Sequence, residues 1–109
     1  MKPDLPDSLN RYYTAQNAHD IDAMAACFSP DAAVHDEGRD IVGSDAVRAW
    51  IAETSAKYRI TAEPLACSID DDHTTVLVKV TGTFPGSPAN LTFRFGFSGD
   101  GKINALAIS

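Results

Sequence analysis

This sequence of 109 residues is poor in cysteine and has no long hydrophobic run. Its two cysteines, Cys27 and Cys67, each lie inside an apolar stretch, where small buried hydrophobes in a reducing compartment are expected rather than a disulfide framework. No segment approaches the ~18 consecutive apolar residues of a membrane helix. The opening MKPDLPDSL also lacks the apolar stretch of a signal peptide. These shortages favour a cytoplasmic protein with no membrane partner.

Basic residues are also scarce. Nine lysines and arginines face fifteen acidic residues, which gives a net charge of −6. That charge repels phosphate backbones, so no nucleic-acid partner is expected. The three histidines have no paired spacing, and the single Gly-x-Gly, at residues 99–101, lies in a predicted hairpin turn. The sequence therefore predicts neither a metal site nor a cofactor.

The residues that are present predict one domain over residues 1–109, because 44% are hydrophobic and the length suits a single core. Apolar residues recur at helical spacing in three segments of the first half. The first begins at Pro6 and ends near Asn17, and Asp20 caps a second that ends before Ser29-Pro30. The third spans about 45–57, with Ser44 as its N-cap. We therefore expect three helices in this half.

From Arg59 onward the hydrophobic period changes to two, and β-branched and aromatic residues predominate. We expect strands at about 60–70, 74–84, 90–98 and 102–109, with Asp71-Asp72-His73 joining the first pair. A short extended piece at 32–35 runs into a charged loop at 36–40. This order predicts an α+β fold, in which the helices cover one face of a curved, mainly antiparallel sheet and enclose a pocket.

Several motifs resemble those of the nuclear transport factor 2-like superfamily, in particular its SnoaL-like and ketosteroid isomerase-like members. They are Arg11-Tyr12, the turn at 19–22, the segment from Phe28 to Gly38, Gly43, and the hairpin exit Gly101-Lys102-Ile103. The resemblance covers nearly the whole chain and implies a cystatin-like cone, with three helices in the N-terminal half packed on the sheet. It specifies a fold better than a reaction.

The resemblance also implies catalytic roles for two residues. Asp36 falls on the position of the general base of ketosteroid isomerase, and Tyr12 matches the tyrosine that donates a hydrogen bond to the enolate. A base near the carbon and a donor near the oxygen are what proton abstraction beside a carbonyl requires. The second acid of that isomerase is replaced by Phe93, and Phe28 and Ile51 stand where two supporting tyrosines would be. Steroid isomerisation is therefore not expected.

Each site residue also has a purely structural interpretation. Asp36 could cap its loop, as aspartates in turns commonly do. His35 would face the pocket in its place if the strand register shifted by one residue. Tyr12 could be a core residue, in which case Tyr13 is the alternative donor.

The predicted walls of the pocket are aromatic. Trp50 lies on the third helix, and Phe93 and Phe95 alternate along one strand, so that both face the helices. Arg94 between them faces the opposite side, where members of the superfamily often form homodimers.

These features predict a protein that binds a small apolar or aromatic organic molecule. An isomerase-like or cyclase-like enzyme, which abstracts a proton next to a carbonyl and uses no cofactor, is one hypothesis. A non-catalytic module of the same fold, which binds a ligand or another protein, is the alternative. A homodimer is expected in either case.

Overall fold

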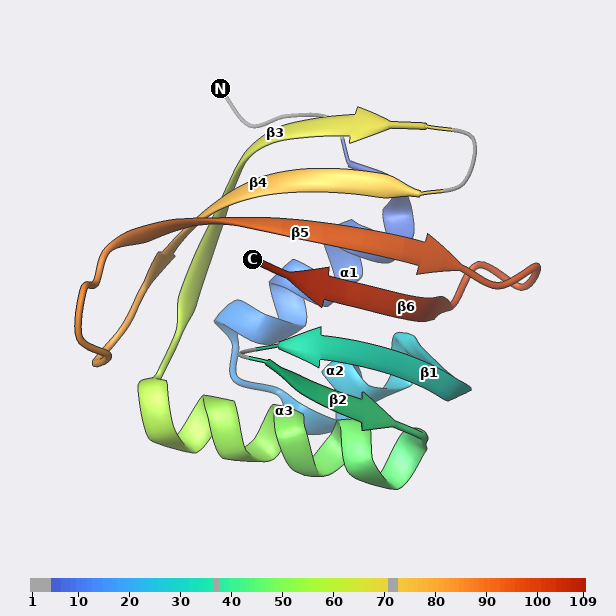
Figure 1. The fold of residues 1–109 in the computed structure, drawn as a ribbon, viewed down its shortest axis with the longest axis horizontal. Helices are drawn as coiled ribbons and strands as arrows, with labels where there is room; N and C mark the ends of the chain where they lie inside the picture. Colours follow the sequence, from blue (N-terminus) through green and yellow to red (C-terminus); the bar gives the residue numbers. More distant parts are fainter. Residues whose placement is uncertain (1–4, 37, 71–72) are drawn as a thin grey trace.

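The computed structural model describes residues 5–36, 38–70 and 73–109 (Figure 1). The elements in these ranges are α1 (Asp7–Asn17), α2 (Ile21–Ala26), β1 (Phe28–Asp36), β2 (Arg39–Val42), α3 (Ser44–Tyr58), β3 (Thr61–Ile69), β4 (Thr74–Thr81), β5 (Ala89–Phe97) and β6 (Ile103–Ile108). The predicted turn at Asp71-Asp72 lies outside the described residues. None of the described helices is long and apolar enough to span a lipid bilayer.

The strands form one sheet in the order β2-β1-β6-β5-β4-β3. Only β1 and β6 are parallel, and every other neighbouring pair is antiparallel. Figure 1 shows α1 and α2 on the far side of the sheet and α3 across its β2 end, while β3 and β4 curve over the helices. The predicted α+β cone with helices packed on a mainly antiparallel sheet is confirmed.

Two of the predicted helix starts can be compared with the structure. The Asp20 side chain accepts a hydrogen bond of 3.1 Å from the backbone N–H of Ala23, as expected of an N-cap. The prediction that Ser44 caps α3 is wrong, because Ser44 is the first helical residue and Gly43 precedes it with no side-chain cap. Gly43 has φ of +93°, a conformation that glycine adopts without the steric cost of a Cβ.

The predicted charged loop at 36–40 is also corrected. β1 continues to Asp36, and β2 pairs with it in an antiparallel hairpin that sets Asp36 opposite Arg39. Pro30 lies within β1 rather than before it, at an irregularity in the pairing between β1 and β6. A proline is tolerated there because the ladder is already interrupted. The hairpin therefore brings Asp36 to the end of a strand rather than into a loop.

The core fills the space between the helices and the inner face of the sheet. Val76, Val78 and Val80 on β4 are fully buried or nearly so, whereas Leu77 between them is 39% exposed. On β5, Phe93 and Phe95 are buried as the alternation predicts. Rings from α1 and β5 pack edge to face within 7 Å of each other, which adds to the stability that burial provides.

A single side chain ties the end of α1 to the start of β3. The Asn17 amide donates to the carbonyl of Ala62 at 2.9 Å and accepts from its backbone N–H at 2.7 Å. Both polar atoms of the amide are therefore satisfied. This clamp fixes α1 against the part of the sheet that curves over the helices.

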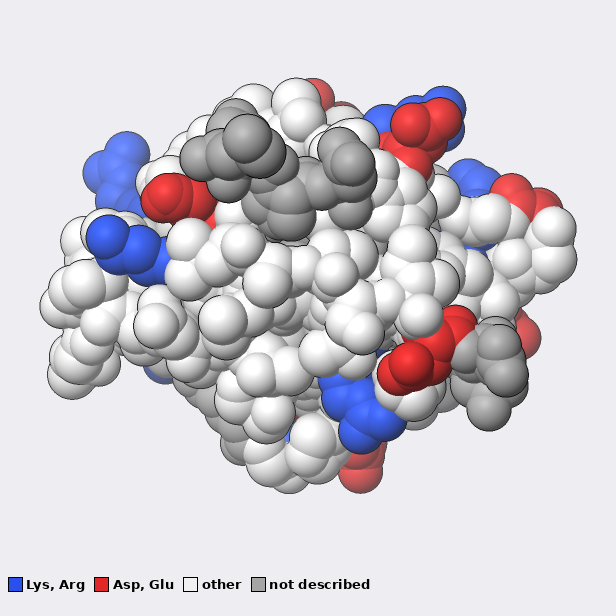
Figure 2. Space-filling view, turned by 90° about the horizontal axis from the view of Figure 1, so that it is seen from above, with Lys and Arg blue, Asp and Glu red and all other residues white. Residues whose placement is uncertain are grey.

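The outer surface of β3 and β4 is less polar than the charge of the chain would suggest. Leu65 on β3 and Leu77 on β4 are 41% and 39% exposed. Figure 2, in which β3 lies nearest the viewer, shows charged side chains mainly toward the margins and uncharged ones over the centre.

Candidate functional site

A cavity of about 510 Å³ lies between the helices and the inner face of the sheet. Its walls come from all three helices, from β1, β4, β5 and β6, and from the segment between β4 and β5. The residues that line it are Tyr12, Gln16, Met24, Asp36, Trp50, Thr54, Tyr58, Ile60, Val80, Phe84, Pro85, Ala89, Leu91, Phe93, Ile108 and Ser109. The lining is mostly apolar with a few polar groups, as in typical small-molecule sites.

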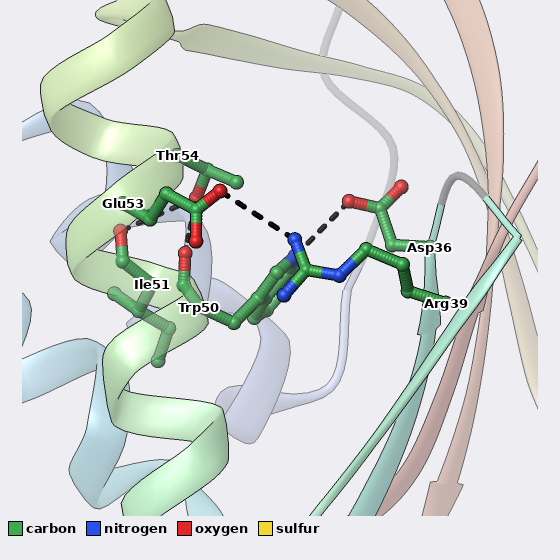
Figure 3. A network of polar contacts seen from close by, with 6 residues as sticks. All are labelled: Asp36, Arg39, Trp50, Ile51, Glu53 and Thr54. Carbon is green, nitrogen blue, oxygen red and sulfur yellow. Dashed lines mark hydrogen bonds and ion pairs between the residues drawn. The ribbon is translucent and has the colours of Figure 1, made fainter.

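Asp36 is the only carboxylate side chain among these lining residues. It lies at the end of β1, and its Oδ2 accepts a hydrogen bond of 3.0 Å from the indole Nε1–H of Trp50 (Figure 3). Among the described residues, the carboxylate has no other hydrogen-bond partner. Trp50 is 5% exposed, so its ring is held by packing in the middle of α3. The indole therefore fixes one carboxylate oxygen and leaves the other available.

The surroundings of Trp50 fix α3 at this point. The Thr54 hydroxyl donates to the backbone carbonyls of Trp50 and Ile51, at 2.9 and 3.2 Å. On the outer side, Arg39 lies 3.5 Å from Glu53, an exposed ion pair between β2 and α3 (Figure 3). Such exposed pairs contribute little to stability, so packing and hydrogen bonds hold the indole.

Tyr12 lines the same cavity from α1 and is 1% exposed. Its ring packs edge to face against Tyr13, Phe28 and Phe95, with centroids 5.1 to 5.8 Å apart. Burial raises the pKa of Tyr12 well above its usual value, and the nearby ionisable groups Cys27 and Asp36 raise it further when they carry negative charge. The phenol therefore stays protonated, which is the state that donates a hydrogen bond.

The structure brings four of the seven predicted site residues to this cavity. Tyr12, Asp36, Trp50 and Phe93 line it. Because neighbouring residues of a strand face opposite sides, the orientation of Asp36 turns His35 away.

The other three predicted residues do not line the cavity. His35 Nδ1 instead pairs with Asp40 Oδ1 at 2.8 Å on the exposed side of the hairpin. Tyr13 and Phe95 are buried in the core. Burial raises the pKa of Tyr13 strongly, with smaller contributions from Tyr12 and Cys67, so its phenol is also protonated.

Sequence reasoning did not single out Gln16, Thr54 or Tyr58, which also line the cavity. Each lies four residues after another lining residue of its helix, and such pairs share a helix face. The spacing was therefore visible in the sequence. It could not show which helix face borders an open space rather than packed side chains.

No group of three or more histidine, cysteine, aspartate or glutamate side chains suited to a metal ion occurs in residues 5–36, 38–70 and 73–109.

Comparison with known families agrees with this geometry. The SnoaL-like domain matches residues 9–105, nearly the whole chain, so the protein belongs to the SnoaL-like family, within the nuclear transport factor 2-like superfamily. Comparison with curated protein sequences gives no significant match.

Solved structures give further similarities. A proposed polyketide cyclase of Sinorhizobium meliloti is 41% identical over 96% of this chain and 95% of its own, with a TM-score of 0.91. SalBIII, an epoxide hydrolase/cyclase-like enzyme in the pyran ring formation of salinomycin, is 20% identical over 94% of this chain and 86% of its own, with a TM-score of 0.82. A protein of Catenulispora acidiphila with a ketosteroid isomerase-like fold, in complex with trimethylamine, is 18% identical over 97% of this chain and 86% of its own, with a TM-score of 0.84. The last two similarities show the fold alone.

Proposed function

We propose that the protein binds a small, largely apolar carbonyl compound in this cavity and catalyses proton transfer at the carbon beside the carbonyl. The observation that carries this proposal is the Asp36–Trp50 hydrogen bond, which orients a carboxylate within a mostly apolar cavity. The similarity to a proposed polyketide cyclase supports it, because enolate chemistry of this kind also underlies ring closure in polyketides.

The two polar groups would act on different atoms of the substrate. Asp36 takes the proton from carbon, and the electron pair of the C–H bond becomes the enolate, whose charge lies mainly on oxygen. The protonated Tyr12 hydroxyl donates a hydrogen bond to that oxygen. Return of the proton at another carbon gives an isomer. Attack of the enolate carbon on a second carbonyl of the same molecule closes a ring, and the proton held by Asp36 passes to the alkoxide oxygen that this attack forms. No metal or organic cofactor enters these steps.

Trp50 is a positioning residue in this scheme. Its N–H holds Asp36 Oδ2, so that Oδ1 remains to receive the proton. An oriented base within reach of the reacting carbon provides most of the benefit of general base catalysis.

Exchange of an activated C–H for deuterium provides a direct test. The C1 protons of 2-tetralone, a bicyclic ketone small enough for the cavity, would be followed by NMR in deuterated buffer with and without the protein. We expect Asp36→Asn to reduce the protein-catalysed exchange by about 100-fold or more, the usual contribution of a general base. Tyr12→Phe should reduce it by about 100-fold, the usual contribution of one oxyanion donor.

Asp40→Asn is the matched control. It makes the same chemical change four residues away, at a side chain that is 81% exposed and lies outside the cavity lining. It should exchange the protons of 2-tetralone at the wild-type rate. An Asp36→Asn variant as active as Asp40→Asn would contradict the proposal, and binding of the ketone without any catalysed exchange would favour a ligand-binding module instead.

A further inference from the structure

The cavity has a second aromatic end, remote from Asp36. Trp50, Thr54 and Tyr58 all line it, and they follow one another at intervals of one helical turn on one face of α3. Because an α-helix rises about 1.5 Å per residue, Tyr58 lies about 12 Å further along α3 than Trp50. Asp36 is bound to the Trp50 indole. The cavity therefore extends along α3 from the carboxylate to Tyr58.

The wall at the Tyr58 end is apolar. The residues that form it come from the end of α3, from the facing ends of β4 and β5, and from the segment between these strands: Tyr58, Ile60, Val80, Phe84, Pro85 and Ala89. Val80 and Ala89 are paired across the two strands. No charged side chain is among these lining residues. This end of the cavity is therefore suited to an apolar part of a ligand.

The rings of Tyr58 and Phe84 form a fixed pair at this end. Their centroids are 6.0 Å apart and their planes meet at 86°, an edge-to-face contact. The Tyr58 backbone carbonyl accepts hydrogen bonds from the Thr83 N–H at 2.8 Å and from the Thr83 hydroxyl at 3.2 Å. Within the same segment, the Gly82 N–H donates to the Ser87 hydroxyl at 2.9 Å. Backbone contacts thus hold the ring pair in place without a ligand.

This pair differs in exposure from the aromatic residues that line the rest of the cavity. Tyr12 and Phe93 are 1% and 3% exposed, because core side chains cover them. Tyr58 and Phe84 are only partly buried. A ligand ring placed beside them would cover apolar surface that water now contacts, and burial of this surface would stabilise the complex.

We propose that Tyr58 and Phe84 form a second subsite, which binds an apolar ring of the ligand remote from its carbonyl. The placement of the carbonyl beside Asp36 rests on the proposed function. The subsite adds a requirement for length, since 2-tetralone would fill only the end of the cavity at Asp36. A cavity of about 510 Å³ has room for a longer molecule. The preferred substrate is therefore an elongated ketone with an apolar ring at its far end.

Two isomeric ketones test this subsite, because they contain the same atoms and differ only in shape. In (4-phenylphenyl)acetone, the para isomer, the outer ring extends away from the activated C–H. In (2-phenylphenyl)acetone, the ortho isomer, it lies beside the activated C–H. Each would be titrated into the protein and followed by NMR. We expect the wild-type protein to bind the para isomer about three- to tenfold more tightly, the ratio that one aromatic contact gives.

Phe84→Ala and Tyr58→Leu each remove one ring of the subsite and should abolish most of this preference. The hydrogen bonds from Thr83 reach the backbone carbonyl of Tyr58, so Tyr58→Leu leaves them in place. Phe97→Ala is the matched control, since Phe97 is also partly buried but does not line the cavity. It should keep the wild-type preference for the para isomer.

Equal binding of the two isomers by the wild-type protein, or no binding of either, would overturn the inference. A preference that persists unchanged in both Phe84→Ala and Tyr58→Leu would also overturn it. So would a loss in Phe97→Ala as large as in Phe84→Ala, because the preference would then depend on general packing. Proton exchange is measured separately on the same ketones. A para preference without catalysed exchange would refute the proposed function alone, whereas exchange without the preference would refute the subsite alone.

Discussion

Replacement of Trp50 by phenylalanine tests the contact on which the site depends. The variant keeps an aromatic ring in the middle of α3 and removes the N–H that Asp36 accepts. A hydrogen bond to a charged group contributes about 1.5–3 kcal/mol, and the partial exposure of Asp36 places this one at the lower end. The smaller ring leaves a void in the core that costs about 1 kcal/mol more. We expect the free energy of unfolding to fall by about 2.5 kcal/mol.

Urea denaturation followed by far-UV circular dichroism measures this change, because Trp50 is the single tryptophan and its fluorescence is lost in the variant. A double-mutant cycle with Asp36→Leu separates the hydrogen bond from the loss of ring volume. The coupling energy should be about 1.5 kcal/mol, because each single variant leaves the other group unpaired. A coupling energy near zero would show that the hydrogen bond does not orient the carboxylate.

Three further predictions concern the frame around the cavity. Asn17→Ala removes two hydrogen bonds to Ala62 and should lower the free energy of unfolding by about 1–3 kcal/mol in urea denaturation; an unchanged value would contradict the clamp. A Cβ on Gly82 would lie 2.5 Å from the Tyr58 carbonyl oxygen, so Gly82→Ala should cost about 1–3 kcal/mol in the same assay, and an unchanged stability would contradict this close approach. Leu77→Lys should convert the expected homodimer to a monomer in sedimentation experiments, and a dimer that persists would place the interface elsewhere.

Periodicity predicted most of the fold because burial imposes it on the sequence. The third helix was expected at about 45–57 and is found at Ser44–Tyr58, and the strand expected at 90–98 is Ala89–Phe97. In both segments one face packs against the core, so apolar residues recur at the period of the element. Glycine and proline residues in the turns also indicated where the strands end.

The short strand β2 could not be predicted in this way. Of its four residues only Ile41 is buried, so no alternation is visible. Its conformation depends on pairing with β1, which sets Asp40 opposite His35 and Arg39 opposite Asp36. Such pairing is a tertiary effect that a local pattern does not contain. Missing β2 affected the prediction of the candidate site, because the hairpin determines which side of β1 carries Asp36.

The same limit explains why the cavity was only partly predictable. Phe93 and Phe95 have the same alternation and the same inward orientation, yet Phe93 lines the cavity and Phe95 is fully buried among the rings of α1. The hydrophobic period of a segment indicates on which face of its helix or strand a side chain lies. Whether that face meets packed atoms or an open space depends on the distance to the opposing element. Polar residues escape this ambiguity in part, since a polar group on an apolar face must find a partner or remain unpaired. Gln16, on the apolar face of α1 beside Tyr12, is such a group, so the sequence held a signal for the cavity that aromatic residues could not provide.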